Sequence, residues 1–165
     1  MKFAIGLVGY TNSGKGTYCS IVRSHYGIPS ITTGDIVRKE VTKRGYDLTS
    51  ENMEKVSDEI RKETNGYFMK IAKPYLDDLL SEKNVIVIDS LREVRDKETL
   101  ETFLDDLKVL GIVASRDSRF RRLLLRQRAG DPSTYNDFVK LEEMERRLGV
   151  HDLLETAEIT IENNS

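Results

Sequence analysis

The sequence predicts an α/β protein built on a doubly wound, five-stranded parallel sheet with helices on both faces. Three observations support this fold class. Short apolar runs alternate with longer helical patterns about five times along the 165 residues, as expected when helices connect parallel strands. Residues 85–88 are four consecutive β-branched residues, which is typical of strands buried on both faces. A glycine-rich segment, residues 9–17, separates the first apolar run from the first helix.

Composition limits the class of protein. A chain of 165 residues fits one domain with one sizeable core. The charged share of 33% and hydrophobic share of 38% are typical of globular proteins. The net charge of −2 argues against an extended nucleic-acid-binding surface, which needs a basic excess. No apolar run approaches the length of a membrane span. With no recognisable signal peptide and Cys19 as the only cysteine, we expect a cytoplasmic protein.

Local signals set the limits of the elements in the first half of the chain. Gly27 ends the first helix, because glycine readily adopts the left-handed conformation found there. Asp35 is the predicted N-cap of the second helix, and Thr49 or Ser50 that of the third. Pro74 should kink or restart the fourth helix, since it removes a backbone donor. The predicted elements are strands at residues 2–8 and just after residue 28, and helices at residues 18–26, 35–45, 50–64 and 67–82.

The second half continues the alternation. Thr134 caps a predicted helix that Gly149 ends, and the alternating side chains near the C-terminus predict a last strand. The predicted elements are strands at residues 85–89, 109–114 and 157–161, and helices at residues 93–106, 116–128, 134–148 and 150–156. Four apolar residues of the helix that begins after Thr134 are predicted to face the core: Phe138, Leu141, Met144 and Leu148.

The glycine-rich segment carries the strongest functional signal. It reads Gly-Tyr-Thr-Asn-Ser-Gly-Lys-Gly-Thr, and G-x-x-x-x-G-K between a strand and a helix predicts a phosphate-binding loop for ATP. Backbone amides and the helix N-terminus attract phosphate there, and Lys15 adds a full charge. Gly16 stands where a Mg²⁺-binding hydroxyl is usual, so Thr17 is the candidate. A solvated lysine on an ordinary glycine-rich turn is the alternative. The predicted nucleotide-binding residues are Gly9, Asn12, Ser13, Gly14, Lys15, Gly16 and Thr17.

A carboxylate ends the apolar run at residues 85–88. Asp89 would lie at the carboxyl edge of the sheet, where ligands gather in open α/β folds. A carboxylate at this place can hold the Mg²⁺ of a bound nucleotide. The alternative is an aspartate that caps the next helix.

Arginines concentrate before residue 130. The simple interpretation is an amphipathic helix with a basic face. A short arginine-bearing loop is also what a lid over ATP needs, because it excludes water and brings positive charge to the transferred phosphate. We therefore predict a lid at residues 121–137, with Arg126 and Arg128, and next Arg122, facing the phosphates. No stacking aromatics are interleaved with these arginines, which argues against RNA.

Several segments resemble P-loop nucleotide kinases. Residues 14–17, Gly-Lys-Gly-Thr, resemble the adenylate kinase form of the loop, and residues 31–38, Ile-Thr-Thr-Gly-Asp-Ile-Val-Arg, are similar to Ile-Ser-Thr-Gly-Asp-Met-Leu-Arg of adenylate kinases. Residues 89–92, Asp-Ser-Leu-Arg, look like the Asp-Gly-Ile-Arg of archaeal P-loop proteins similar to nucleotide and dephospho-CoA kinases. The likeness extends to Arg-Gln-Arg-Ala-Gly-Asp-Pro at residues 126–132 and Ile-Glu-Asn-Asn at residues 161–164.

The resemblance implies a nucleoside monophosphate kinase-like P-loop fold and phosphoryl transfer from ATP, with Mg²⁺, to a small nucleotide-like acceptor. The acceptor classes left open are nucleoside monophosphates, deoxynucleoside monophosphates and dephospho-CoA. The acceptor would lie under a helical cover, residues 34–82. The resemblance assigns the acceptor phosphate to Thr33, Gly34 and Arg38. It places Asp35 near the Mg²⁺ water shell or the attacking oxygen. Arg92 would clamp the transferred or acceptor phosphate, as planar bidentate guanidinium groups do.

Two other functions stay open. One is a regulatory ATPase, although Ser90 follows Asp89 where hydrolysing enzymes of this type carry a catalytic glutamate. The other is a nucleotide-binding module without turnover, for which Gly16 leaves room. The presence of Lys15, Thr17 and Asp89 together favours the kinase.

Overall fold

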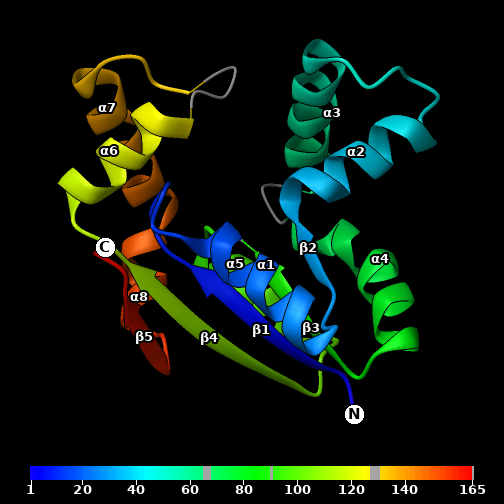
Figure 1. The fold of residues 1–165 in the computed structure, drawn as a ribbon. Coiled ribbons are helices and arrows are strands. Elements are labelled where there is room, and N and C mark those ends of the chain that lie inside the picture. Colours follow the sequence, from blue (N-terminus) through cyan, green and yellow to red (C-terminus); the bar gives the residue numbers. More distant parts are fainter. Residues whose placement is uncertain (65–67, 90, 127–130, 165) are drawn as a thin grey trace.

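A parallel five-stranded sheet forms the centre of the computed structural model (Figure 1). The structure describes residues 1–64, 68–89, 91–126 and 131–164. The strand order is β2-β3-β1-β4-β5, and every neighbouring pair runs parallel. This confirms the predicted fold class. The strands are β1 (Phe3–Val8), β2 (Ser30–Thr32), β3 (Val85–Asp89), β4 (Asp106–Val113) and β5 (Ile159–Glu162).

The central position of β1 decides where ligands can bind. Phe3 pairs with Val85 of β3 on one side and with Asp106 of β4 on the other. The chain moves from β1 to β2 and β3 in one direction and to β4 and β5 in the other. A crevice outside the carboxyl ends of the strands is expected at such a reversal. The glycine-rich segment follows β1 at this edge, and Asp89 ends β3 beside it.

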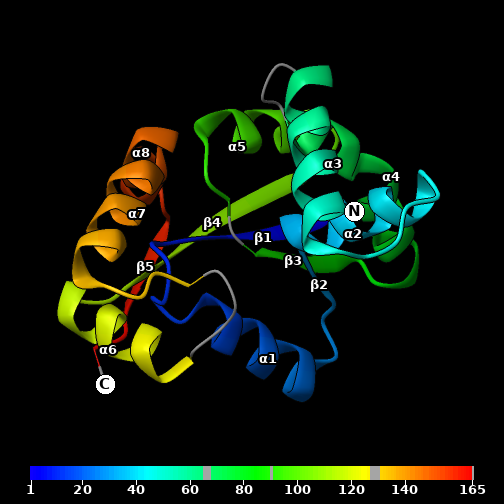
Figure 2. The same cartoon turned by 90° about the horizontal axis from the view of Figure 1, so that it is seen from above.

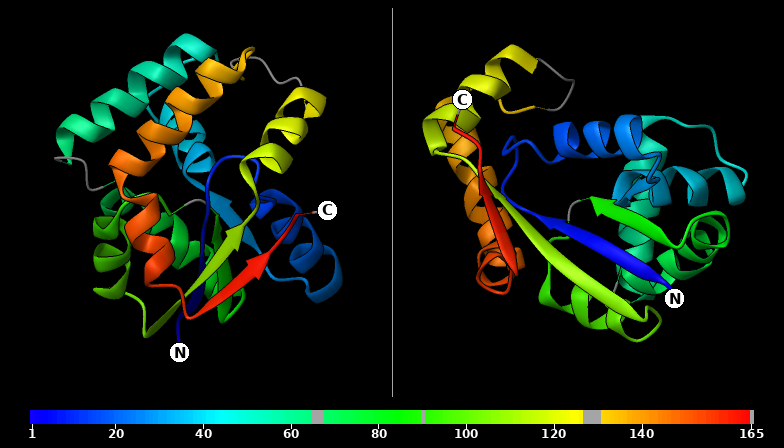
Figure 3. Two further views of the ribbon diagram at one scale, coloured as in Figure 1. Left: turned by 90° about the vertical axis from the view of Figure 1, so that its left-hand side faces the viewer. Right: turned by 60° about the horizontal axis from the view of Figure 1, so that its bottom comes forward.

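Helices cover both faces of the sheet, and two groups of helices rise above its carboxyl edge. Figure 3 shows α1 on one face and α5 and α8 on the other. From above, α2 and α3 lie on one side of the glycine-rich segment, and α6 and α7 lie on the other (Figure 2). The helices are α1 (Lys15–Tyr26), α2 (Thr33–Lys43), α3 (Ser50–Glu63), α4 (Met69–Glu82), α5 (Val94–Glu101), α6 (Arg116–Arg126), α7 (Tyr135–Leu148) and α8 (Val150–Glu155).

Two apolar clusters hold these layers together. The smaller one joins α1 to the sheet through residues such as Cys19, Val22 and Leu110. The larger one joins the opposite face to α2, α3, α4, α5 and α8 and includes Ile86 and Leu100. None of the helices in the described ranges is long and apolar enough to cross a membrane.

The structure corrects two predicted helix starts. The first helix begins at Lys15 rather than Tyr18, because Gly14 acts as a left-handed N-cap and its carbonyl accepts from the Tyr18 amide at 3.1 Å. Thr32, not Asp35, is the N-cap of α2. The Asp35 amide donates to Thr32 Oγ1 at 2.9 Å, and the Thr32 amide donates to Asp35 Oδ2 at 2.8 Å. This reciprocal capping box places Asp35 inside the first turn.

Other differences arise from tertiary contacts. The helix predicted to end at residue 106 ends at Glu101, because the backbone amides of Asp105 and Asp106 donate to the Lys2 carbonyl as β4 begins. The predicted restart at Pro74 is wrong, since α4 runs through it.

The buried face of α7 also differs from the prediction. Phe138 is buried as predicted, but Met144 is 45% exposed and the neighbouring Glu145 is buried instead. The reason is a contact of Glu145 with the glycine-rich segment, described below.

Candidate functional site

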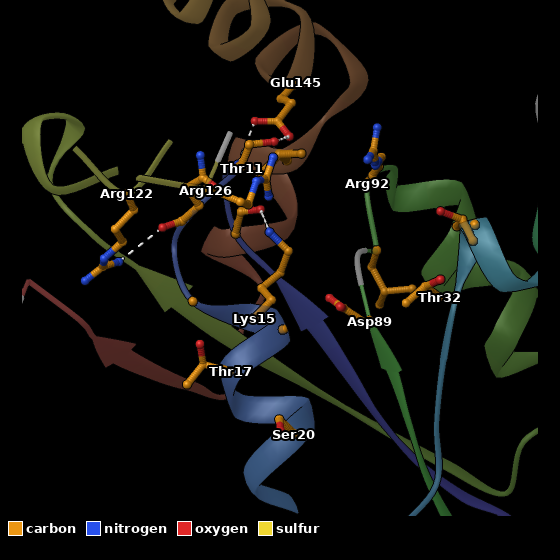
Figure 4. Close-up of a pocket in the computed structure, with 18 residues that line it drawn as sticks. Thr11, Lys15, Thr17, Ser20, Thr32, Asp89, Arg92, Arg122, Arg126 and Glu145 are labelled. Atoms are coloured by element: carbon orange, nitrogen blue, oxygen red, sulfur yellow. Dashed lines mark hydrogen bonds between the residues drawn. The ribbon is translucent and has the colours of Figure 1, made fainter. Parts of the chain in front are cut away.

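A cavity of about 830 Å³ opens at the carboxyl edge of the sheet (Figure 4). Its walls come from the glycine-rich segment, the first turns of α1, the β2–α2 junction, the end of β3, and helices α6 and α7. The predicted nucleotide-binding residues that line it are Gly9, Asn12, Gly14, Lys15, Gly16 and Thr17. The remaining predicted residue, Ser13, belongs to the same segment but is fully buried.

The conformation of the glycine-rich segment depends on two glycines. Gly9 has a φ of +157°, and a Cβ atom there would lie 2.2 Å from the Ile112 carbonyl oxygen. Gly14 has a φ of +111°, and its Cβ would lie 2.2 Å from Asn163 Nδ2. Any other residue would be strained at both positions. The segment therefore turns tightly around one end of the cavity and leads into the positive end of α1.

Lys15 extends over this turn. Its ammonium group donates to the carbonyl oxygens of Gly9 at 2.6 Å and Tyr10 at 3.1 Å. Burial lowers the pKa of Lys15, while the negative charges of Asp89 and Glu145 act in the opposite direction. A phosphate chain in the cavity would supply the stronger negative partner that this desolvated cation needs.

Asp89 and Thr17 line the same cavity and are the candidates for Mg²⁺. Asp89 is only 9% exposed, whereas Thr17 is exposed. The Lys15 side chain lies between them in Figure 4. Among the described residues, no group of three or more His, Cys, Asp or Glu side chains gathers as a metal site. One carboxylate and one hydroxyl suit Mg²⁺, which commonly takes its remaining ligands from substrate phosphates and water.

A second cavity of about 320 Å³ lies beside the first. The two cavities share three residues: Thr33, Gly34 and Arg92. The second cavity extends under α3, which contributes Arg61 and Glu54. Its other charged wall is Glu93 and Asp96, at the start of α5, and its apolar wall consists of Val37, Met53, Phe68 and Leu148.

The acceptor residues implied by the resemblance separate into two groups. Thr33 and Gly34 line both cavities. Arg38 lines neither, and its guanidinium group pairs with Asp35 at 2.7 Å. Burial would raise the pKa of Asp35, but hydrogen bonds from Arg38 and Thr32 prevail and hold this pKa below its ordinary value. Asp35 is thus an anion that fixes the start of α2.

The predicted lid arginines also have different neighbours. Arg126 lines the first cavity and pairs with Asp131, whose Oδ2 accepts from Nε at 2.9 Å. Arg122 lines the cavity too, but its guanidinium donates to the carbonyl oxygens of Asn12 at 3.1 Å and Ser13 at 3.3 Å. Arg128 and the middle of the predicted lid lie outside the described residues.

Several site residues were missed from the sequence, and Arg61 and Glu145 are two of them. Arg61 reaches the second cavity one turn after Ser57 and two turns after Met53, a spacing that the sequence contains. Glu145 lines the first cavity although it is only 3% exposed. The signal for Glu145 was its place in the spacing 138, 141, 145, 148, where a charged residue interrupts an apolar helix stripe. A buried carboxylate needs partners, so this interruption was the one signal in the sequence for a polar contact of Glu145.

Comparisons with known proteins show the family to which this chain belongs. Residues 8–138 match the AAA_17 family model, described as an AAA domain, so the chain carries a domain of that family. A UPF0200 protein of Thermococcus sibiricus is 32% identical over 164 residues, which cover 98% of this chain and 86% of the relative. The chain belongs to the UPF0200 family. The UPF0200 protein PF1294 of Pyrococcus furiosus is 34% identical and covers similar shares, 95% and 86%. This UPF0200 chain spans 50% of the UPF0200/UPF0201 protein of Archaeoglobus fulgidus, to which it is 35% identical.

Solved structures show the same fold as this UPF0200 protein. A putative kinase from Chloroflexus aurantiacus superposes with a TM-score of 0.64 at 18% identity and covers 99% of this chain and 89% of its own. Shikimate kinase from Acinetobacter baumannii gives 0.59 at 19% identity, with shares of 98% and 84%. The predicted P-loop kinase-like fold is therefore confirmed. The narrower likeness to the Asp-Gly-Ile-Arg group stays a prediction.

Proposed function

We propose that this UPF0200 protein is an ATP-dependent kinase that transfers the γ-phosphate to a small acceptor in the second cavity. The observation that carries the proposal is the junction of the two cavities at Thr33, Gly34 and Arg92. A nucleotide hydrolase needs room for the nucleotide and a water molecule only. A separate compartment that opens at the transfer point instead favours a second substrate.

In this proposal, the first cavity holds the donor. The amides of the glycine-rich segment and Lys15 bind the donor phosphates, and Asp89 and Thr17 hold Mg²⁺. When bound, Mg²⁺ would neutralise charge that develops on the phosphate oxygens. Arg92 at the junction and Arg126 on α6 would neutralise the transferred group, and Arg128 is proposed to share this role. Catalysis by this arrangement rests on positioning and electrostatic stabilisation.

The acceptor proposal follows from charges in the second cavity. Arg61 and Arg92 suit an anionic group of the acceptor. Glu54, Glu93 and Asp96 suit hydrogen-bond donors, and burial raises the pKa of Asp96 to about 6. A nucleoside monophosphate or deoxynucleoside monophosphate meets both requirements, because its phosphate pairs with arginine and its hydroxyl or amino groups donate to carboxylates. Thr33 and Gly34 would position the acceptor phosphate, with Asp35 fixing their backbone.

The direct experiment is ADP production from Mg-ATP with a panel of acceptors. The panel contains the common nucleoside and deoxynucleoside monophosphates, dephospho-CoA and a blank with water alone. We expect strong stimulation by one acceptor class. Turnover that is equal in the blank would indicate a regulatory ATPase, and ATP binding without turnover would indicate a binding module; either result contradicts the proposal.

Arg61 and Arg38 form a matched pair for the acceptor site, since each is a partly exposed arginine paired with an aspartate three residues away. Arg61→Ala should raise the KM of the acceptor about 10-fold and leave the KM of ATP unchanged, because a charge-assisted contact is lost in the second cavity only. Arg38→Ala should change the acceptor KM less. Steady-state kinetics measure both KM values. A larger rise of the acceptor KM in Arg38→Ala than in Arg61→Ala would show that Arg38, not Arg61, binds the acceptor phosphate.

A further inference from the structure

The glycine-rich segment is held from outside by a helix that the loop motif does not include. The Thr11 amide donates to Glu145 Oε2 at 2.9 Å, and the Thr11 hydroxyl donates to Glu145 Oε1 at 2.6 Å. Both carboxylate oxygens of Glu145 thus bind one residue of the segment. Glu145 comes from α7, 134 positions later in the chain, and Figure 4 shows it pointing at Thr11 above Lys15.

Residues of α6 contact the segment on both sides of Thr11, at Tyr10 and at Asn12 and Ser13. The Arg119 guanidinium lies 5.1 Å from the centre of the Tyr10 ring. Arg122 donates to the carbonyl oxygens of Asn12 and Ser13, as described above. The outward side of residues 10–13 is therefore in contact with the α6–α7 pair along its length. Arg119 and Arg122 are cations, whereas Glu145 is a carboxylate, and Glu145 also lines the cavity.

A carboxylate is an unexpected group in a cavity that is to receive a polyphosphate. It repels phosphate at short range, so it is not suited to bind the donor. Its two short hydrogen bonds have another consequence. The carboxylate accepts from both the amide and the hydroxyl of Thr11. These bonds fix the orientation of the Thr11 backbone, and with it the orientation of the amides that follow in the turn. Burial makes this arrangement rigid, because an unpaired carboxylate at 3% exposure would be costly.

We infer that Glu145 is a positioning residue that acts through Thr11 to set the phosphate-binding geometry of the glycine-rich segment. The inference rests on the proposed nucleotide site. It assigns to α7 a part in the donor site that neither the loop motif nor the fold supplies. The negative charge of Glu145 also supports phosphate binding in a second way, because it favours the charged form of the half-buried Lys15 ammonium.

The test is calorimetric titration of the full chain with Mg-ATP and Mg-ADP. Glu145→Ala should weaken nucleotide binding by about 10- to 100-fold, because small displacements of positioned groups have effects of this size. Glu145→Gln should restore most of the affinity, since its amide oxygen can accept from the Thr11 amide and its amide nitrogen can donate to the Thr11 hydroxyl. Thr11→Val, which removes only the hydroxyl, should lie between the two. Glu143→Ala is the matched control, because Glu143 is exposed on the same helix.

Two readouts separate positioning from a general loss of structure. Thermal unfolding shows whether Glu145→Ala is folded at the titration temperature, and Thr11→Val supplies the test from the loop side if it is not. The KM of the acceptor should stay unchanged in all variants, because Glu145 does not line the second cavity. Suppose that Lys15→Ala loses affinity for the nucleotide, but Glu145→Ala and Thr11→Val bind it as tightly as wild type or more tightly. This result would overturn the inference about Glu145 and leave the proposed nucleotide site intact. Wild-type affinity in Lys15→Ala would overturn the nucleotide site, and the inference with it.

Discussion

Lys15→Ala is expected to abolish phosphoryl transfer, with a loss in kcat/KM of about 1,000-fold or more, while the protein stays folded. The Lys15 ammonium is the cation that extends over the glycine-rich turn, and the segment itself contains no second charged side chain. Without Lys15, no side chain of the segment neutralises the negative charge that develops on the donor phosphates during transfer. The Lys15 ammonium donates to the carbonyl oxygens of Gly9 and Tyr10, which both belong to the glycine-rich segment, so we expect its loss to affect that segment rather than the apolar core.

The measurement for Lys15 combines kinetics with thermal unfolding. Burial lowers the pKa of Lys15, so the folded state already bears a cost for the charged side chain, and its loss should leave the midpoint of unfolding near that of wild type. Lys83→Ala is the matched control, since Lys83 is exposed and precedes β3 at the opposite edge of the sheet. Transfer by Lys15→Ala at the wild-type rate would show that the cavity is not the donor site.

Arg92→Ala is expected to lower kcat by roughly 1,000-fold, the scale reported for arginines that neutralise a transferred phosphate. Arg92 is the only charged residue shared by the two cavities in the described part of the chain. Its guanidinium can therefore face the phosphate in both its donor-bound and acceptor-bound positions. The backbone of Arg92 is held by Asp96, whose Oδ2 accepts from the Arg92 amide at 3.4 Å. The affinity for ATP alone should change less than kcat, because most of this interaction is gained during transfer.

Two further variants sharpen the Arg92 experiment. Arg92→Lys keeps the charge but not the planar fork, and should recover only part of the lost rate. Arg95→Ala is the matched control, because Arg95 is exposed on α5 and lines neither cavity. A large loss of ATP affinity in Arg92→Ala with unchanged kcat would instead make Arg92 a simple donor-binding residue.

The parts of this protein that follow from local sequence were predictable. The β-branched run before Asp89 is typical of a buried strand. The turn at Gly9 and Gly14 requires residues without a side chain. Once β1 and β3 are neighbours, Asp89 must lie near Lys15, since parallel strands end at the same edge. Capping signals at Thr49, Thr134 and Gly149 also gave correct helix limits.

What the sequence did not predict depends on long-range contacts. The end of α5 is set by the Lys2 carbonyl, about a hundred positions earlier, which no local pattern contains. Arg61 becomes a cavity residue only because α3 lies above the start of α5. Glu145 was hidden by its charge, since a glutamate on a helix is usually exposed, and Met144 was assigned to the core in its place.

The central claim is that the γ-phosphate moves from ATP to an acceptor rather than to water. The most direct measurement follows ATP labelled at the γ-phosphate through a complete reaction with the acceptor that most stimulates ADP release. We predict that label appears on the acceptor in an amount equal to the ADP formed, and that omission of Mg²⁺ stops this transfer. Label that accumulates in inorganic phosphate at the same rate with and without acceptor would contradict the kinase assignment and indicate an ATPase.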